Sequence, residues 1–400
     1  MADQHKESSA SLTSTEAKAF ELAQEAVMVK SVPVAEGTPI IKGFDFNTGR
    51  DLDGIMAAAM TTGFQATNLA KAVEEVNRMR RWRLSDRPVK PDEDDDLKDP
   101  AVRAGVKATI FFSYTSNMVS CGVRETIRFL AQHKMVDCIV TSAGGVEEDF
   151  LKCLRPTYLG DFNLKGRDLR LKGQNRIGNL VVENRNYCEF EDWLNPILNK
   201  MTDEQEADKV VWTPSTMIER LGREIDNEES IYYWCAKNDI PVFCPALTDG
   251  SIGDMIYFHK YKRPEFILDI SGDVKRINDI AVRAPCTGMI IVGGGLVKHH
   301  VCNANLMRNG ADFAVFMNTG NPPWSFPCRW LFGFCSEPKS SFIGAVALLT
   351  EHAGGESFVW PGRGVVASRN AFLYLNPHAW RGRSWLLPPA LAIGHCWSRI

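Results

Sequence analysis

The chain has 400 residues and a formal net charge of −3, with 44% hydrophobic and 24% charged residues. These are ordinary values for a globular protein with a substantial core, and they give no basic field of the kind that binds nucleic acids. No apolar run reaches the roughly 18–20 residues that span a bilayer, and the first residues lack the apolar core of a signal peptide. We therefore expect a soluble, cytoplasmic protein without nucleic-acid or membrane partners.

The eleven cysteines form no C-x-x-C pair and no Cys/His series with the spacing of a zinc site. An odd number of irregularly spaced cysteines indicates reduced thiols rather than a disulfide framework. We expect no metal site.

Residues 1–106 predict a helical region followed by a charged linker. A helix is expected from Glu16 to about Lys30, because a capping-box spacing precedes it and a proline follows. A second helical stretch, about Asp51 to Arg83, is interrupted by Gly63. Residues 85–100 are charged, contain prolines and have no apolar period, which predicts an exposed linker.

From residue 107 to 319, short apolar runs alternate with amphipathic stretches. The runs expected to form strands are ATIFFSY, DCIVTSA, NLVV, IPVFCPAL, EFILDIS, MIIVGGG and DFAVFMN. Stretches such as RETIRFLAQHKM, STMIERLGREI and GDVKRINDIAV are expected to form helices between them. Such alternation is typical of a buried parallel sheet. We predict an α/β fold: a doubly wound, mostly parallel, Rossmann-like sheet with helices on both faces, plus the N-terminal helical extension.

Polar residues gather at the ends of four of these expected strands. In chain order they are Thr115-Ser116-Asn117, then Ser142-Ala143-Gly144-Gly145 with Glu147 and Glu148, then Thr248-Asp249-Gly250-Ser251 with Asp254, and last Gly293-Gly294-Gly295 with Lys298, His299 and His300. Ligands of such sheets lie beyond the carboxyl ends of the strands, where the free amides at helix starts can hold an anion.

Each of the four groups also has an ordinary structural explanation. Glutamates in a first helical turn are favoured by the helix dipole, a glycine run after a strand makes a tight turn, and an aspartate before glycine is a turn residue. Paired histidines near a helix start are more often structural than catalytic. Together, however, the groups offer donors for a pyrophosphate, carboxylates for ammonium groups, and a histidine able to move a proton near neutral pH. The residues thus predict a dinucleotide-dependent enzyme that acts on a cation.

Long runs of the sequence resemble deoxyhypusine synthase, over about residues 40–319. They include TTGFQATN, YTSNMVSCGVRETIRFLAQHKMVD, TSAGGVEEDFLKCLRPTYLG, WTPSTMIERLGREI, ALTDGSIGDMIYFH, MIIVGGGLVKHH and NANLMRNGADFAVFMNT. Details such as MRRWR are most similar to the fungal members. The resemblance implies NAD-dependent transfer of the aminobutyl group of spermidine, through an imine on an enzyme lysine, to one lysine of the translation factor 5A precursor. It also implies a homotetramer with active sites at dimer interfaces, in which an N-terminal helix such as residues 13–30 can cover a neighbouring entrance.

The resemblance also assigns roles to individual positions. The implied NAD contacts are Ser116, Asn117, Met118, Val119, Ser120, Ser142, Ala143, Gly144, Glu148, Asp249, Gly294 and Thr319. The implied polyamine contacts are Glu147, Glu148, Asp254 and His299. His299 matches the general base of the family.

Residues 320–400 do not match that family. After Thr319 the family continues with a Gly-Ser-Asp run and then E-A-V-S-W-G-K, whose lysine is the covalent nucleophile, and neither run is present here. Lys339 is the only lysine of this tail, and because its neighbours do not match we interpret it as an exposed loop lysine. The tail holds six of the ten Trp, eight of the twenty Pro and no Asp.

Several hypotheses follow from this departure. The composition of the tail favours a wrong gene model or an aberrant splice product, with a genuine variant C-terminus as the alternative, and cDNA read across the codons for 319–321 separates the two. For function, the leading hypothesis is a deoxyhypusine synthase. The alternatives are a catalytically inactive isoform or regulatory subunit that assembles with intact chains, and a generic dinucleotide-binding hydrolase or dehydrogenase.

Overall fold

The computed structural model describes residues 15, 18, 19, 22, 33–91 and 93–318. The chain divides into two compact units, up to Ile41 and from Lys42 onward, and the second unit contains the fold. The helix expected from Glu16 to Lys30 lies, except for three positions, outside the described residues. Thr319 and the tail 320–400 lie outside them as well.

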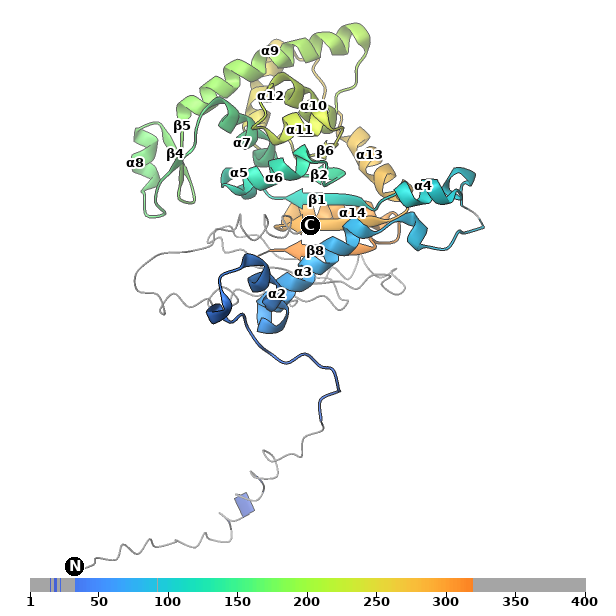
Figure 1. Cartoon of the computed structure of the whole chain (residues 1–400). Coiled ribbons are helices and arrows are strands. Elements are labelled where there is room, and N and C mark those ends of the chain that lie inside the picture. The colour runs from blue at the N-terminus through green and yellow to red at the C-terminus, as the bar shows by residue number, and fades with distance from the viewer. Residues whose placement is uncertain (1–14, 16–17, 20–21, 23–32, 92, 319–400) are drawn as a thin grey trace, which may run out of the picture. The chain divides into compact units, whose positions relative to one another are not determined.

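Helices and strands alternate through the second unit (Figure 1). The α-helices are α2 (Leu52–Thr62), α3 (Phe64–Arg81), α4 (Pro100–Gly105), α5 (Asn117–Ser120), α6 (Val123–Gln132), α7 (Ala143–Leu154), α8 (Gly166–Leu171), α9 (Asn184–Asp208), α10 (Pro214–Glu224), α11 (Ile231–Lys237), α12 (Ser251–Lys262), α13 (Ile270–Arg283) and α14 (Gly295–Leu306). Short 3-10 helices are η1 (Phe46–Thr48), η2 (Leu84–Asp86) and η3 (Asp95–Leu97). The strands are β1 (Thr109–Tyr114), β2 (Cys138–Val140), β3 (Tyr158–Leu159), β4 (Gln174–Ile177), β5 (Leu180–Glu183), β6 (Val242–Phe243), β7 (Thr287–Val292) and β8 (Phe313–Met317).

Five strands form one parallel sheet in the order β6-β2-β1-β7-β8. In its centre Phe112 of β1 pairs with Ile139 of β2 on one side and with Ile290 of β7 on the other. The chain first winds outward from β1 through β2 to β6 and then returns to build β7 and β8 on the opposite side. The strand order therefore reverses between β1 and β7, and the crevice beyond their carboxyl ends is where ligands of doubly wound sheets bind.

Both faces of this sheet are covered, as the apolar strands predicted. Successive side chains of a strand point to opposite faces. Accordingly, Phe111 packs into a core with α13 and α14, through residues such as Ile277 and Val301. Its neighbours Ile110 and Phe112 pack into the larger core of the other face, which α3, α6, α7, α10 and α11 supply with apolar side chains. The expected doubly wound α/β fold is confirmed.

Helix α3 lies directly on the sheet. A Cβ added to Gly288 of β7 would stand 2.8 Å from the sulfur of Met79 in α3, so the glycine allows a close approach. Gly63, which separates α2 from α3, has φ of 94°, a backbone conformation that favours glycine. The predicted interruption of this helical stretch is thus confirmed. The charged segment after α3 contacts the central sheet through an ion pair of 2.7 Å between Arg87 and Asp312, the residue just before β8.

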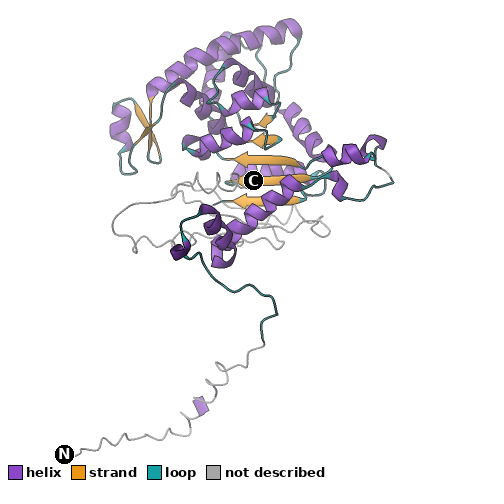
Figure 2. Ribbon diagram, viewed as in Figure 1, coloured by secondary structure: helices purple, strands orange, loops and turns teal. Residues whose placement is uncertain are grey.

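Two of the expected strands do not join the parallel sheet. NLVV forms β5 in a separate antiparallel sheet of order β3-β5-β4, which Figure 2 shows apart from the central strands. The reason is local, because Gly178, with φ of 60°, turns the chain back from β4 into a hairpin. EFILDIS makes only a single bridge, from Leu268 to Trp212, because Asp269 caps the start of α13 and ends the extended segment. No helix among the described residues combines the length and the apolar character needed to cross a membrane.

Candidate functional site

The chain segments that follow β1 and β7, where the strand order reverses, are in close contact through a glycine. Gly293 follows β7 with φ of 102°, and a Cβ there would stand 2.7 Å from the hydroxyl oxygen of Thr115, which follows β1. The two chain segments therefore pass each other at a distance that only glycine permits. Gly294, by contrast, has no atom within 4 Å of its ideal Cβ position, so the start of α14 faces open space.

The segments that follow β1 and β2 are also packed together. The backbone amide of Ser116 donates a hydrogen bond to the hydroxyl of Ser142 at 3.2 Å. A Cβ on Gly144 would stand 2.9 Å from the Cβ of Ser116 and 3.5 Å from a carboxylate oxygen of Glu148. The sequence prediction that these strand ends lie at one edge of one sheet is confirmed by the order of the strands, and the contacts bring Ser116, Ser142, Gly144 and Glu148 into one cluster.

Three consecutive carboxylates of α7 point in three directions, because successive residues of a helix are rotated by about 100°. Glu147 is 9% exposed and accepts a hydrogen bond from the amide of Ile252 at 3.1 Å. A Cβ on Gly250 would come within 2.6 Å of its carboxylate, so the side chain fills the space at the start of α12. Burial raises the pKa of Glu147, amide hydrogen bonds from Ile252 and Ser251 oppose that shift, and the negative charges of Asp254 and Asp249 add to it.

Glu148 faces α5 instead. Burial raises the pKa of its carboxyl to about 7, the Ser120 hydroxyl and the charge of Lys152 oppose that shift, and Glu147 adds to it. The carboxyl is therefore a group that changes its charge near neutral pH. A cation placed beside it would favour the ionised form.

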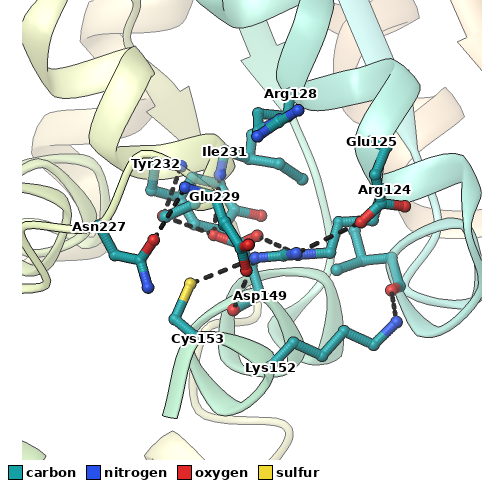
Figure 3. A network of polar contacts seen from close by, with 12 residues as sticks. Arg124, Glu125, Arg128, Asp149, Lys152, Cys153, Asn227, Glu229, Ile231 and Tyr232 are labelled. Atoms are coloured by element: carbon teal, nitrogen blue, oxygen red, sulfur yellow. Dashed lines mark hydrogen bonds and ion pairs between the residues drawn. The ribbon is translucent and has the colours of Figure 1, made fainter. Parts of the chain in front are cut away.

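Asp149 faces the third direction and is part of a buried polar network (Figure 3). Its carboxylate accepts hydrogen bonds from Arg124 Nε at 2.7 Å, from the Ser230 hydroxyl at 2.6 Å and from the Ile231 amide at 3.0 Å. Asp149 thereby joins α7 to α6 and to the start of α11. Because the three carboxylates are consecutive, this network also fixes the rotation of α7 about its axis and with it the directions of Glu147 and Glu148.

Three of the remaining acidic and histidine positions are open to solvent, whereas His300 is partly buried. Asp249, Asp254 and His299 all have exposed side chains. The two aspartates lie close enough to Glu147 to affect its pKa. Among the described residues no hydrogen bond joins His299 to Glu147 or Glu148. His299 lies in the second turn of α14, and its exposed side chain stands on the rim of the site.

Some positions implied as NAD contacts have buried side chains. Met118, Val119 and Ala143 are 5%, 0% and 2% exposed, respectively, and belong to the large core. Only their backbone groups can face a ligand. Asn117 accepts a hydrogen bond from the hydroxyl of Thr115 at 2.5 Å, and helix α5, expected to be an anion-binding helix start, has only four residues. Thr319 lies outside the described residues.

Sequence reasoning missed two residues beside the carboxylates. Lys152 lies one helical turn after Glu148, a spacing that could have signalled it. Tyr187 of α9 lies close enough that burial and the charges of Glu148 and Glu147 raise its pKa. No spacing in the sequence relates Tyr187 to α7, because α8 and the small sheet lie between them. Among the described residues no three His, Cys, Asp or Glu side chains are placed to hold a metal ion.

The parallel sheet with its reversal between β1 and β7 makes this chain a Rossmann-like α/β protein. The sequence model of the deoxyhypusine synthase family matches residues 54–325. Deoxyhypusine synthase of Senecio vernalis is 56% identical over 296 residues, 73% of this chain and 80% of that protein. The enzyme of Arabidopsis thaliana is 57% identical over 283 residues, 70% and 77% of the two chains. The chain belongs to the deoxyhypusine synthase family and is a transferase of that type.

A solved structure agrees with this assignment. A protein from Entamoeba histolytica, provisionally assigned as a deoxyhypusine synthase, is 34% identical, with a TM-score of 0.53 over 70% of this chain and 87% of that one. The likenesses confirm the suspected family and do not favour an inactive isoform or regulatory subunit. The family match ends at residue 325, so most of the tail lies beyond it.

Proposed function

We propose that this chain transfers the aminobutyl group of spermidine to a lysine of the translation factor 5A precursor, with NAD as the hydride carrier. The observation that carries the proposal is the pair Glu147 and Glu148, largely buried at the carboxyl edge of the sheet, with exposed Asp249 and Asp254 beside Glu147. A polyamine is a chain of ammonium groups, and each of them gains more from a carboxylate in a partly dry site than from one in water.

The edge of the sheet has the groups that a dinucleotide requires. NAD, when bound, accepts a hydride from the carbon next to the reacting amine and later returns it. Amides at the starts of α7 and α14 and the hydroxyls of Ser116 and Ser142 are donors for its phosphates. The open space at Gly294 lets the dinucleotide approach the backbone, and Asp249 and Glu148 are acceptors for its hydroxyl groups.

The chain's own residues then have separate tasks. Glu148 and Asp254 hold ammonium groups, and Glu147 holds the start of α12 on which Asp254 stands. His299, which is exposed, takes a proton from the amine as the hydride leaves. The acceptor lysine of the protein substrate reaches the site from solvent.

The exposed side chains at this edge of the sheet favour an assembly of several copies, and we place that assembly in the cytoplasm as part of the proposal. We propose a homotetramer in which a second copy covers the edge where Asp249, Asp254 and His299 are open. Tyr257, Phe258 and Tyr261 extend the exposed face of α12 away from Asp254, and they are 57%, 56% and 76% exposed, respectively. Aromatic side chains of this kind are enriched at interfaces.

The test is transfer by the full chain. The protein would be incubated with NAD, labelled spermidine and the 5A precursor, and label on the precursor and release of diaminopropane would be measured together. Transfer supports the proposed function and would mean that residues 320–400 supply a nucleophile or that the lysine relay is dispensable. Lys339→Ala then decides between the two, because it abolishes transfer only if Lys339 is that nucleophile.

The other outcomes are equally informative. NAD-dependent release of diaminopropane without transfer locates the defect at the relay lysine and leaves the first half of the reaction in place. Neither activity, in a folded protein, overturns the proposal, and co-expression with an intact synthase then tests the regulatory alternative. His299→Ala should abolish both activities. Exposed His133→Ala, at the end of α6, is the matched control and should change neither.

A further inference from the structure

Lys152 makes two contacts with the segment that follows β1. Its ammonium group donates hydrogen bonds to the backbone carbonyl oxygens of Val119 at 2.7 Å and of Ser120 at 2.5 Å. These carbonyls end helix α5, which is too short to satisfy them within the helix. A lysine at the end of a helix satisfies such carbonyls and compensates their partial negative charge. Figure 3 shows Lys152 extending from the helix that carries Asp149 and Cys153, below the Asp149 network in this view.

The same lysine stands one turn after Glu148 on α7. A glutamate four residues before a lysine is a favourable pair on a helix. The positive charge of Lys152 lowers the pKa of Glu148, and burial lowers the pKa of Lys152 while Glu148 opposes that shift. Both groups are largely removed from solvent, so screening of their interaction by salt is weak.

Ser120 contacts both Lys152 and Glu148. Its carbonyl oxygen accepts from Lys152, and its hydroxyl interacts with the carboxylate of Glu148 and with the carbonyl oxygen of Ser116 at 3.3 Å. If the end of α5 moves, the hydroxyl of Ser120 moves with it, and Glu148 loses a donor. The position of α5 and the charge of Glu148 are therefore coupled through one side chain.

We propose that Lys152 is a positioning residue that fixes the end of α5 against α7 and with it the Ser120 hydroxyl that faces Glu148. This assignment deepens the proposed function, because α5 and Glu148 belong to the proposed cofactor and polyamine site. Other charged or titratable groups also face this pair: Arg124 and Glu125 of α6, Cys121 after α5, Glu147 of α7 and Tyr187 of α9. Arg124 already pairs with Asp149, so it does not replace Lys152.

The test compares Lys152→Met with Lys152→Arg and with the control Lys200→Met, an exposed lysine on α9. The first readout is amide hydrogen exchange in the full chain, which needs no ligand. In Lys152→Met the amides of residues 117–122 should exchange about tenfold faster, whereas residues 217–224 of α10 should be unchanged and so report an intact fold. Lys152→Arg, which keeps charge and donors, and Lys200→Met should both exchange like the wild type.

The second readout is ligand binding as a function of pH. In Lys152→Met the affinity for NAD, measured by quenching of protein fluorescence, should fall about tenfold, and the midpoint of the pH dependence of spermidine binding should move to higher pH. Unchanged exchange in residues 117–122, or equal behaviour of the Met and Arg variants, overturns the inference. If the wild type itself binds no NAD, the cofactor proposal fails, and the exchange data alone then decide the role of Lys152.

Discussion

The carboxylate of Glu147 accepts a hydrogen bond from the amide of Ile252 and occupies the space where Gly250 lacks a side chain. The resemblance to the family implies that Glu147 contacts the polyamine, yet in this structure its carboxylate holds the start of α12. Asp254, also implied as a polyamine contact, stands in the first turn of that helix. Glu147 therefore acts on the substrate at least partly through the position of Asp254.

Replacement of Glu147 separates its charge from its role as a cap. Glu147→Ala removes an acceptor for two amides at the start of α12 and should lower the free energy of unfolding by about 1 kcal/mol. Glu147→Gln keeps an oxygen acceptor and should remain within about 0.5 kcal/mol of the wild type. Urea unfolding measures both values. Equal losses in the two variants would show that the charge, and not the cap, stabilises the fold.

Glu148 should make the stability of the protein depend on pH. Its pKa is about 7 in the folded state against 4.5 as the reference, so the folded protein binds more protons between these values. The free energy of unfolding therefore falls as pH rises from about 5 to about 7 and levels off above. The full shift corresponds to about 3 kcal/mol, which partial exposure reduces to about 1–2 kcal/mol. Glu148→Gln should lack this decline and be more stable than the wild type at pH 8, and equal pH slopes in urea unfolding would contradict the assignment.

Binding of a polyamine should remove the proton from the carboxyl group of Glu148. An ammonium group beside the carboxyl favours its ionised form, so binding at pH 6 releases protons and the affinity for spermidine should rise as pH rises toward 7. Isothermal titration calorimetry in two buffers of different ionisation enthalpy measures the protons released. The Glu148→Gln variant is the control and should release fewer protons than the wild type.

Gly293 and Gly294 are adjacent but should respond differently to alanine. Gly293 has φ of 102°, and a Cβ added to it would stand 2.7 Å from the Thr115 hydroxyl oxygen. Gly293→Ala should therefore lower the free energy of unfolding by about 1–3 kcal/mol. Gly294→Ala meets no atom within 4 Å and should change the stability by less than about 0.5 kcal/mol. It should nevertheless weaken NAD binding, because the methyl group enters the open space at the start of α14. Unfolding and fluorescence titrations on the same samples check both statements.

The central sheet could be predicted from the sequence because its strands are nearly continuous apolar runs separated by amphipathic helices. The prediction for NLVV was wrong because an apolar run does not specify the strand with which it pairs. The adjacent Gly178 turns the chain so that NLVV pairs with β4 in a hairpin. The prediction for EFILDIS was wrong because Asp269, inside the run, begins a helix.

The site could be predicted only as a set of strand ends. The sequence places Glu147, Glu148 and Asp149 side by side, and nothing in their order says that one caps α12, one faces α5 and one is paired inside the core. That outcome depends on the rotation of α7 and on partners up to 105 residues away in the chain. Tyr187 reaches the carboxylates from α9 for the same reason, through packing between distant segments.

Loss of the Asp149 charge should be the most damaging of these changes to the fold. Asp149→Asn leaves the buried guanidinium group of Arg124 with only the exposed and more distant Glu125 as a charge partner, which should cost about 3 kcal/mol. Ser230→Ala removes one hydroxyl donor and the cap of α11 and should cost about 1 kcal/mol. Glu219→Gln breaks an exposed pair with Arg223 and should cost less than about 0.5 kcal/mol.

A double variant tests whether the cost of Asp149→Asn comes from the unpaired charge. Arg124→Met combined with Asp149→Leu removes both charges, so neither charge is left unpaired. The double variant should therefore lose less free energy of unfolding than the two single variants lose together. Urea unfolding of the four proteins gives the coupling free energy between the two positions. A coupling below about 0.5 kcal/mol would show that the ion pair does not hold α7 in place, and the directions of Glu147 and Glu148 would then depend on apolar packing alone.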